Sequence, residues 1–263
     1  MKTFTRKIFI GGNWKSNNTL EESKNIVSWL NKVEFDAEKV EVLIAPPCLH
    51  IPSIKEALTN HSIFISAQNI SAYGFGAYTG EISFKHLADF GVEWTLLGHS
   101  ERRSLFHETS EEVATKTKLA VENKLKVVLC VGEKLEEREA GKTFAVVEEQ
   151  LNAVIALLKD KASWDSIVVA YEPVWAIGTG KVASPAQAQE VHAFTRKFLA
   201  EKLGQEVAST LRIIYGGSVN EKNSSELLQQ EDIDGFLIGG ASLKPAFGEI
   251  ITSANNDAKE KST

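Results

Sequence analysis

The chain has 263 residues, of which 43% are hydrophobic, 24% charged and 8% aromatic, and this composition excludes disordered and collagen-like proteins. Its length allows one or two domains, although α/β barrels often use about 250 residues for one. The 29 basic and 35 acidic residues give a net charge of -6, so nucleic acid is not an expected partner. An anionic ligand would need a local positive site within this acidic body.

The sequence contains no pattern typical of export, membrane insertion or metal binding. The N-terminal residues lack the apolar segment of a signal peptide, and no apolar stretch approaches the roughly 18 residues of a membrane helix. Cys48 and Cys130 lie in apolar stretches, where we expect buried, reduced thiols. No Cys/His cluster has the spacing of metal ligands. We therefore expect a cytoplasmic protein that binds neither a metal nor a membrane.

Short apolar runs rich in Val and Ile alternate with stretches of helical periodicity along the whole chain. Runs of this kind are typical of parallel strands that are buried on both faces. The expected strands are Ile8–Ile10, Val40–Ala45, Ile63–Ala67, Trp94–Leu97, Val127–Val131, Ile167–Tyr171, Ile213–Tyr215 and Phe236–Ile238. The main expected helices are Leu20–Val33, Glu111–Asn123, Ala145–Lys159, Pro185–Leu203 and Ser224–Gln230. Thr19, followed by Glu21 and Glu22, predicts the start of the first helix.

Eight strand–helix repeats predict a closed (β/α)8 barrel of the α/β class. Each repeat has roughly 33 residues, which is the size of one βαβ step, and eight steps close a barrel. An open doubly wound sheet is the alternative, but the first strand is not followed by a glycine-rich dinucleotide loop. No linker or change of composition marks a second domain. We expect residues 1–263 to form a single domain, with a polar C-terminal tail over roughly 252–263.

The loops that follow the carboxyl ends of barrel strands build the active site in such folds. Glu172 follows a buried strand and precedes Pro173. Burial would raise the pKa of its carboxyl, which would suit a general base. A salt bridge at the strand end is an equally good interpretation. His99 precedes Ser100 at a predicted helix N-terminus, which favours a neutral imidazole able to donate a hydrogen bond. A purely structural histidine is the alternative.

Candidate anion-binding groups follow the first, seventh and eighth strands. Lys15 follows the first strand and supplies a positive charge at the barrel mouth. The glycine pairs Gly216–Gly217 and Gly239–Gly240, together with Ser218, offer backbone N–H groups where many barrels bind phosphate, although ordinary turns use the same residues. The segment 173–183 has proline at one end and glycines near the other, which indicates a lid that closes over a ligand.

Several motifs in a fixed order show that the chain resembles the triosephosphate isomerase family. They run from near residue 8 to near residue 250. The motifs are Gly12–Lys15, Gly76–Glu81, Gly98–Arg103, Ala170–Lys181, Tyr215–Val219 and Gly239–Leu243. The resemblance implies a (β/α)8 barrel that interconverts dihydroxyacetone phosphate and glyceraldehyde 3-phosphate, in glycolysis and gluconeogenesis, without a cofactor.

The resemblance also implies roles for individual residues. Glu172 would remove a proton to give an enediolate, and neutral His99 would polarise the carbonyl; the family is a known case of this pairing. Lys15 would stabilise the developing oxyanion, with Asn13 orienting it, and Ser100 would hold Glu172 in the open state. Substrate-binding residues would be Asn13, Lys15, Gly178, Ser218, Gly239 and Gly240, and closure of the lid would exclude water.

Family members are usually homodimers, so the resemblance implies a homodimer joined by the Gly76–Glu81 loop. Thr79 would approach the partner's active site near Asn13, and Glu81 would pair with Arg102 across the interface. Two residues depart from the family pattern. Tyr78 stands where Phe is common, and His107 stands where glycine is expected, which costs strain if its φ is positive.

Two other functions stay open at this stage. An aldolase on the same barrel would use Lys15 as a Schiff-base nucleophile. An inactive barrel would act only as a binding scaffold, although the joint presence of Asn13, Lys15, His99 and Glu172 disfavours this. Trapping of substrate on Lys15 by borohydride, or an isomerase assay, separates these alternatives.

Overall fold

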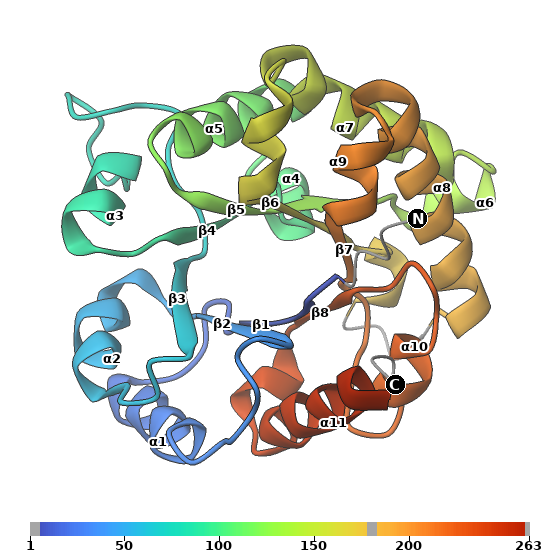
Figure 1. Ribbon diagram of the computed structural model, residues 1–263. Helices are drawn as coiled ribbons and strands as arrows, with labels where there is room; N and C mark the ends of the chain where they lie inside the picture. Colours follow the sequence, from blue (N-terminus) through green and yellow to red (C-terminus); the bar gives the residue numbers. More distant parts are fainter. Residues whose placement is uncertain (1–5, 178–182, 261–263) are drawn as a thin grey trace.

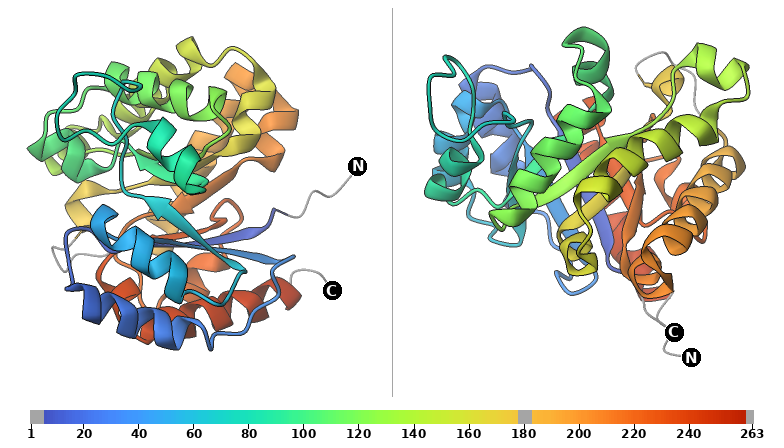
Figure 2. Two further views of the ribbon diagram at one scale, coloured as in Figure 1. Left: turned by 90° about the vertical axis from the view of Figure 1, so that its left-hand side faces the viewer. Right: turned by 90° about the horizontal axis from the view of Figure 1, so that it is seen from above.

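The computed structural model describes residues 6–177 and 183–260, and these form a closed barrel of eight parallel strands. The strands are hydrogen-bonded in chain order from β1 to β8, and helices surround the ring (Figures 1 and 2). The barrel closes where β1 pairs with β8, with Phe9 opposite Gly235. The (β/α)8 fold predicted from the strand–helix repeats is therefore confirmed.

All eight predicted strands are present, and most of their residues are buried, as expected for β-branched runs covered on both faces. The first strand extends three residues further than predicted, to Asn13. The bounds are β1 Ile8–Asn13, β2 Val40–Ala45, β3 Ile63–Ala67, β4 Trp94–Leu97, β5 Lys126–Val131, β6 Ile167–Tyr171, β7 Arg212–Tyr215 and β8 Gly235–Ile238.

Helices follow the strands and form the outer layer, and α1 starts directly after the cap residue predicted for it. Thr19 caps α1 with a reciprocal pair: its hydroxyl accepts from Glu22 N–H, and the Glu22 carboxylate accepts from Thr19 N–H. The bounds are α1 Leu20–Leu30, α2 Ile51–Ala57, α3 Phe84–Phe90, α4 Ser100–Leu105, α5 Ser110–Glu122, α6 Leu135–Glu139, α7 Thr143–Leu157, α8 Pro185–Leu203, α9 Gln205–Thr210, α10 Ser224–Leu228 and α11 Ala246–Glu260. Short 3-10 helices are η1 Cys48–His50, η2 Lys161–Ser166, η3 Val174–Ala176 and η4 Gly240–Leu243.

The C-terminal segment differs from the expected polar tail, because α11 stays helical through Glu260. Two polar side chains in it are buried and hydrogen-bonded to residues outside the helix. Asn255 accepts a hydrogen bond from the Asp36 N–H at 2.8 Å, and Asp257 accepts one from the Ser225 hydroxyl at 2.9 Å. With Ala254 fully buried, these contacts hold the last helix against the barrel.

The core has two parts, one inside the barrel and one between the barrel and its helices. Phe9, Trp94 and Ile214 are among the side chains that fill the interior, so the barrel is packed and its polar groups gather at the mouth. Cys130 is buried as expected, but Cys48 is exposed, because η1 lifts it out of the apolar run after β2. Within the two described ranges, no helix is both long and apolar enough to cross a bilayer.

Candidate active site

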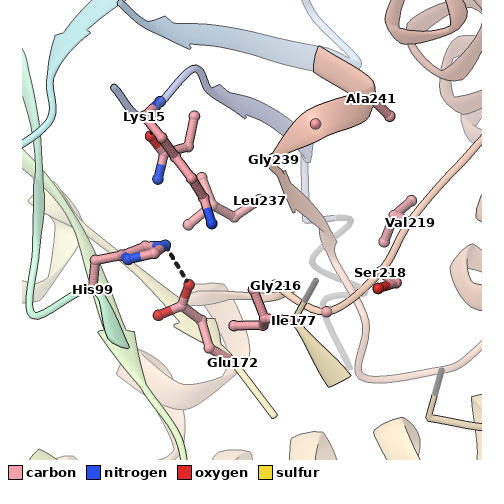
Figure 3. A pocket seen from close by; sticks show the side chains of 13 residues that line it. Lys15, His99, Glu172, Ile177, Gly216, Ser218, Val219, Leu237, Gly239 and Ala241 are labelled. Atoms are coloured by element: carbon pink, nitrogen blue, oxygen red, sulfur yellow. Dashed lines mark hydrogen bonds and ion pairs between the residues drawn. The ribbon is translucent and has the colours of Figure 1, made fainter. Parts of the chain in front are cut away.

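The polar residues predicted at the strand exits converge on one cavity at the carboxyl end of the barrel. Asn13 ends β1, His99 follows β4 and Glu172 follows β6, while Lys15 lies on the loop after β1. The cavity has a volume of about 230 Å³. Figure 3 shows the side chains of Lys15, His99 and Glu172 pointing into the same space, with Gly239 and Ser218 at its other side.

Glu172 is held by two groups from the segment after β4. Its Oε1 lies 2.9 Å from His99 Nε2, and its Oε2 accepts a hydrogen bond of 3.0 Å from the Ser100 N–H. The partner expected for the open state, Ser100, is thus present, through its backbone rather than its hydroxyl. His99 caps α4, and its Nδ1 accepts from the Glu101 N–H at 3.2 Å. This bond places the proton on Nε2, the tautomer that donates into the cavity.

The carboxylate and imidazole shift each other's proton affinity. Burial raises the pKa of Glu172, but the His99 imidazole and the Ser100 N–H outweigh burial, and the net pKa is lowered. Burial lowers the pKa of His99, whereas the Glu172 charge and, less strongly, Glu101 raise it above its ordinary value. The raised Glu172 pKa expected from its strand context is therefore not found while the two side chains are in contact, and the raised His99 pKa disfavours the neutral imidazole expected there. The contact between the two side chains therefore sets the direction of both pKa shifts against the effect of burial.

Lys15 occupies a strained backbone position that aims its side chain across the cavity. Its φ is 53°, in the left-handed region that costs a non-glycine residue roughly 1 kcal/mol or more. Asn13 Oδ1 accepts from the Lys15 N–H at 3.0 Å, and the Gln68 amide donates to the Lys15 carbonyl at 2.7 Å. The ammonium pairs with Glu101 Oε1 at 2.5 Å. Local hydrogen bonds therefore offset the strain and fix a positive charge at the mouth.

The glycine-rich loops after β7 and β8 form the side of the cavity opposite His99 (Figure 3). The Ser218 hydroxyl donates to the Ala176 carbonyl at 2.7 Å, which ties the β7 loop to the segment after β6. Gly239 precedes η4, and a side chain there would lie 3.5 Å from the Lys15 Cε. The Gly239 backbone and the Lys15 ammonium thus border the same part of the cavity. Gly178 and the rest of 178–182 in the predicted lid lie outside the described residues.

Glu133 is a fully buried carboxylate beside the site, and the sequence indicated it only as a strand exit. It collects side-chain hydrogen bonds from β6, η3, α6 and α7, donated by Tyr171, Trp175, Arg138 and Thr143 at 3.0–3.3 Å. Burial, followed by the Glu133 charge, raises the pKa of the Tyr171 hydroxyl well above its usual range, so it stays a donor. Four donors from four elements cannot be deduced from sequence spacing, which explains why this residue was missed.

His192 is a second buried polar residue that sequence reasoning did not single out. It lies on α8, its Nδ1 is 3.1 Å from the Asp232 carbonyl, and its ring stands edge-on to Tyr171. Burial lowers the pKa of His192 to about 4, so it is neutral at physiological pH. The sequence places His192 in a predicted helix but does not show which face of that helix packs against the barrel.

A groove lies beside the active-site cavity, and the exposed ring of Phe106 is part of its lining. Leu49, Tyr78 and Leu105 are exposed as well, and each lies within two residues in the sequence of a residue that lines the groove. The groove has a volume of about 360 Å³ and shares Asn13 and Lys15 with the active-site cavity. The loop between β3 and α3, which carries Tyr78, projects from the barrel (Figures 1 and 2).

Two residues near this groove bear on the sequence predictions. His107 has φ 57°, so the strain predicted for a non-glycine residue is present. Arg102 pairs with Glu108 of the same chain at 2.7 Å. The cross-subunit pair of Arg102 with Glu81 therefore stays a prediction.

A glutamate and a histidine in contact at the mouth of a (β/α)8 barrel, with a fixed ammonium beside them, define an enzyme of the proton-transfer class. The family model described as "Triosephosphate isomerase" matches residues 8–254. The chain belongs to the triosephosphate isomerase family. Enzymes of this family interconvert dihydroxyacetone phosphate and glyceraldehyde 3-phosphate in glycolysis, and this chain is an isomerase of that kind.

Curated relatives cover nearly the whole chain. The triosephosphate isomerase of Coprinopsis cinerea is 55% identical over 95% of this chain and 98% of its own length. That of Saccharomyces cerevisiae is 50% identical over 95% of this chain and 99% of its own length. The chloroplastic triosephosphate isomerase of Arabidopsis thaliana is 53% identical over 95% of this chain and 78% of its own length.

Proposed function

We propose that Glu172 is the general base of the isomerisation and that His99 is its electrophilic partner. The observation that carries this proposal is the 2.9 Å contact between Glu172 and His99 Nε2 inside the cavity. Glu172 is 2% exposed and His99 6%, so both act in a site where the surrounding protein, rather than bulk water, sets their strength.

In the proposed reaction the Glu172 carboxylate takes a proton from the carbon beside the substrate carbonyl. The electrons of that C–H bond form the C–C double bond of an enediolate, and the carbonyl oxygen takes up the negative charge. His99 Nε2–H donates to this oxygen and moves a proton between the two oxygens, while Lys15 stabilises the charge and Asn13 orients Lys15. Glu172 then returns its proton to the neighbouring carbon, and the aldose or ketose is released.

The substrate phosphate is proposed to bind at the side of the cavity opposite His99. Ser218, Gly239 and Gly240 lie there and offer backbone N–H groups, and Gly178 is a further proposed donor. The Lys15 ammonium adds a positive charge next to Gly239. This local charge attracts a small anion despite the net charge of -6.

A coupled assay on glyceraldehyde 3-phosphate tests the assignment directly. Glu172→Gln keeps the shape of the side chain but removes the base, so turnover should fall by a factor of roughly 1,000 or more while inorganic phosphate still competes at the site. Turnover close to wild type in this variant would exclude Glu172 as the base. Borohydride treatment in the presence of substrate should leave Lys15 unmodified, since its ammonium is ion-paired.

We also propose a homodimer built on the exposed apolar surface around the groove. Leu105 and Phe106 are 68% and 61% exposed, and Tyr78 lies on a projecting loop; burial of such a surface is what a stable dimer provides. The groove borders Asn13 and Lys15, so Thr79 of the second copy would complete the site. Sedimentation should show a dimer, and Phe106→Glu should give monomers with reduced turnover. A fully active monomer at low concentration would refute the dimer.

Residues 1–263 are proposed to fold as one domain. Limited proteolysis tests this, because a single closed barrel should yield one protected core.

The enzyme is proposed to act in the cytoplasm. Its support is that the fungal relatives at 50–55% identity carry no organelle in their names. Microscopy of the fluorescently tagged chain tests the location.

A further inference from the structure

We propose that Gln150, on the outer helix α7, is a positioning residue for the base Glu172 and acts through the backbone of Gly132. Gln150 does not enter the active-site cavity and touches no proposed substrate group. The inference rests on the proposed role of Glu172. It adds a residue outside the barrel wall to those that determine turnover.

The side-chain amide of Gln150 binds both backbone groups of Gly132. Its Oε1 accepts from the Gly132 N–H at 2.8 Å, and its Nε2 donates to the Gly132 carbonyl at 3.2 Å. The amide therefore behaves like a neighbouring strand at the point where β5 has ended. Both hydrogen bonds come from one planar group, so they fix the direction of the Gly132 backbone as well as its distance.

The segment around Gly132 carries the backbone of the base. The Glu172 N–H donates to the Val131 carbonyl at 2.7 Å, and the Val174 N–H donates to the Glu133 carbonyl at 3.1 Å. Between these two bonds the chains are in close contact, because a Cβ on Gly132 would lie 1.8 Å from the Glu172 carbonyl oxygen. Any displacement of Gly132 is thus transmitted to Glu172 without an intervening side chain.

The surroundings of Gln150 indicate that this pair sets position rather than holding the fold together. Gln150, Gly132 and Glu172 line one cavity of about 310 Å³ on the side of α7. Gln150 is only partly buried, so water can replace its two hydrogen bonds when the side chain is removed. The barrel would persist, while the end of β5 and the backbone of Glu172 would lose their fixed direction.

Proton abstraction is sensitive to such a displacement. A misplacement of about 1 Å can cost roughly 100-fold in rate, and smaller shifts cost proportionately less. Binding of the phosphate depends on the loops after β7 and β8, which Gln150 does not contact. The expected signature is a loss in kcat with little change in KM.

The test compares Gln150→Leu, which removes both hydrogen bonds at similar volume, with Asn152→Leu, which makes the same change at an exposed position of α7. Steady-state isomerisation of glyceraldehyde 3-phosphate should give kcat about tenfold lower for Gln150→Leu, KM within twofold, and an unchanged inhibition constant for inorganic phosphate. Asn152→Leu should match wild type. Gln150→Glu keeps the bond from the Gly132 N–H, so it should fold and show an intermediate kcat.

Two results would overturn the proposal. The first is a wild-type kcat in both Gln150 variants. The second is a loss in which KM and the inhibition constant for inorganic phosphate worsen as much as kcat, because a general loosening of the barrel would affect all three. Glu172→Gln run in parallel separates the two proposals. If that variant is inactive while Gln150→Leu equals wild type, the base assignment survives and only the positioning role fails. An active Glu172→Gln would remove the base assignment itself.

Discussion

Protonation of His192 should destabilise the folded protein in mild acid. The ring is fully buried between α8 and the barrel, and burial lowers its pKa from 6.5 to about 4. As the pH falls below 6.5 the unfolded chain therefore takes up a proton that the folded chain refuses. The stability contributed by neutral His192 is fully present above pH 6.5, is lost progressively below it, and is gone below about pH 4.

The size of this effect follows from the two pKa values. At 1.36 kcal/mol for each pKa unit, the gap between 6.5 and about 4 corresponds to about 3 kcal/mol in the free energy of unfolding. Between pH 7.5 and pH 5.0, where most of the titration of the unfolded chain occurs, the loss is about 2 kcal/mol. This amount is a large fraction of the stability of an ordinary domain.

His192→Asn isolates this contribution, because the asparagine amide can still donate to the Asp232 carbonyl but does not titrate. Urea unfolding followed by tryptophan fluorescence, at one protein concentration, gives the free energy of unfolding of both proteins at pH 7.5 and 5.0. The variant should be less stable at pH 7.5 through lost packing, and this deficit should shrink by about 2 kcal/mol at pH 5.0. A deficit of equal size at both pH values would refute the reasoning, since other acid-sensitive groups titrate in both proteins and cancel.

Three further variants test local features of the fold by the same unfolding assay. Thr19→Ala removes the cap of α1 and should cost about 1 kcal/mol, whereas Thr19→Ser should be near neutral; equal losses would contradict the capping role. His107→Gly relieves a positive φ and should change stability by roughly 1 kcal/mol or less in the favourable direction, because the gain is partly offset by the freer unfolded chain. Gly98 has φ 72°, and a Cβ added there would lie 2.9 Å from Val113 Cγ1 and 3.0 Å from the Cys130 carbonyl oxygen. Gly98→Ala should therefore lower the free energy of unfolding by more than about 2 kcal/mol. A smaller loss would show that Gly98 tolerates a side chain.

The strands and long helices could be predicted because their signals are local. Runs such as Ile167–Tyr171 carry no charged residue, and a cap such as Thr19 with Glu22 marks a helix start without reference to the rest of the chain. The short helices α2 and α3 were not predicted, since a segment of seven residues gives only a weak periodic signal, although the equally short Ser224–Gln230 was recognised. The C-terminal helix was mistaken for a tail because its polar residues are buried only against distant partners.

The positions of the site residues could be predicted, but their interactions could not. Strand exits identify Glu172 and His99, whereas the pKa of each depends on a contact between the segments after β4 and β6 that no spacing encodes. Glu133 and Gln150 show the same limit, because their hydrogen-bond partners lie on other elements that only the folded barrel brings together. Cys48 was predicted to be buried because its sequence neighbours are apolar, but the chain turns outward at that residue and exposes it.

The pairing of β1 with β8 also sets the order in which a refolding chain regains its properties. Phe9 and Gly235 lie at nearly opposite ends of the sequence, so their pairing closes almost the longest loop available to the chain. Lys15 follows β1 and Gly239 follows β8, so the cavity that both residues line exists only after this closure. Circular dichroism should therefore recover before turnover does, because turnover also requires that the two ends of the barrel have met.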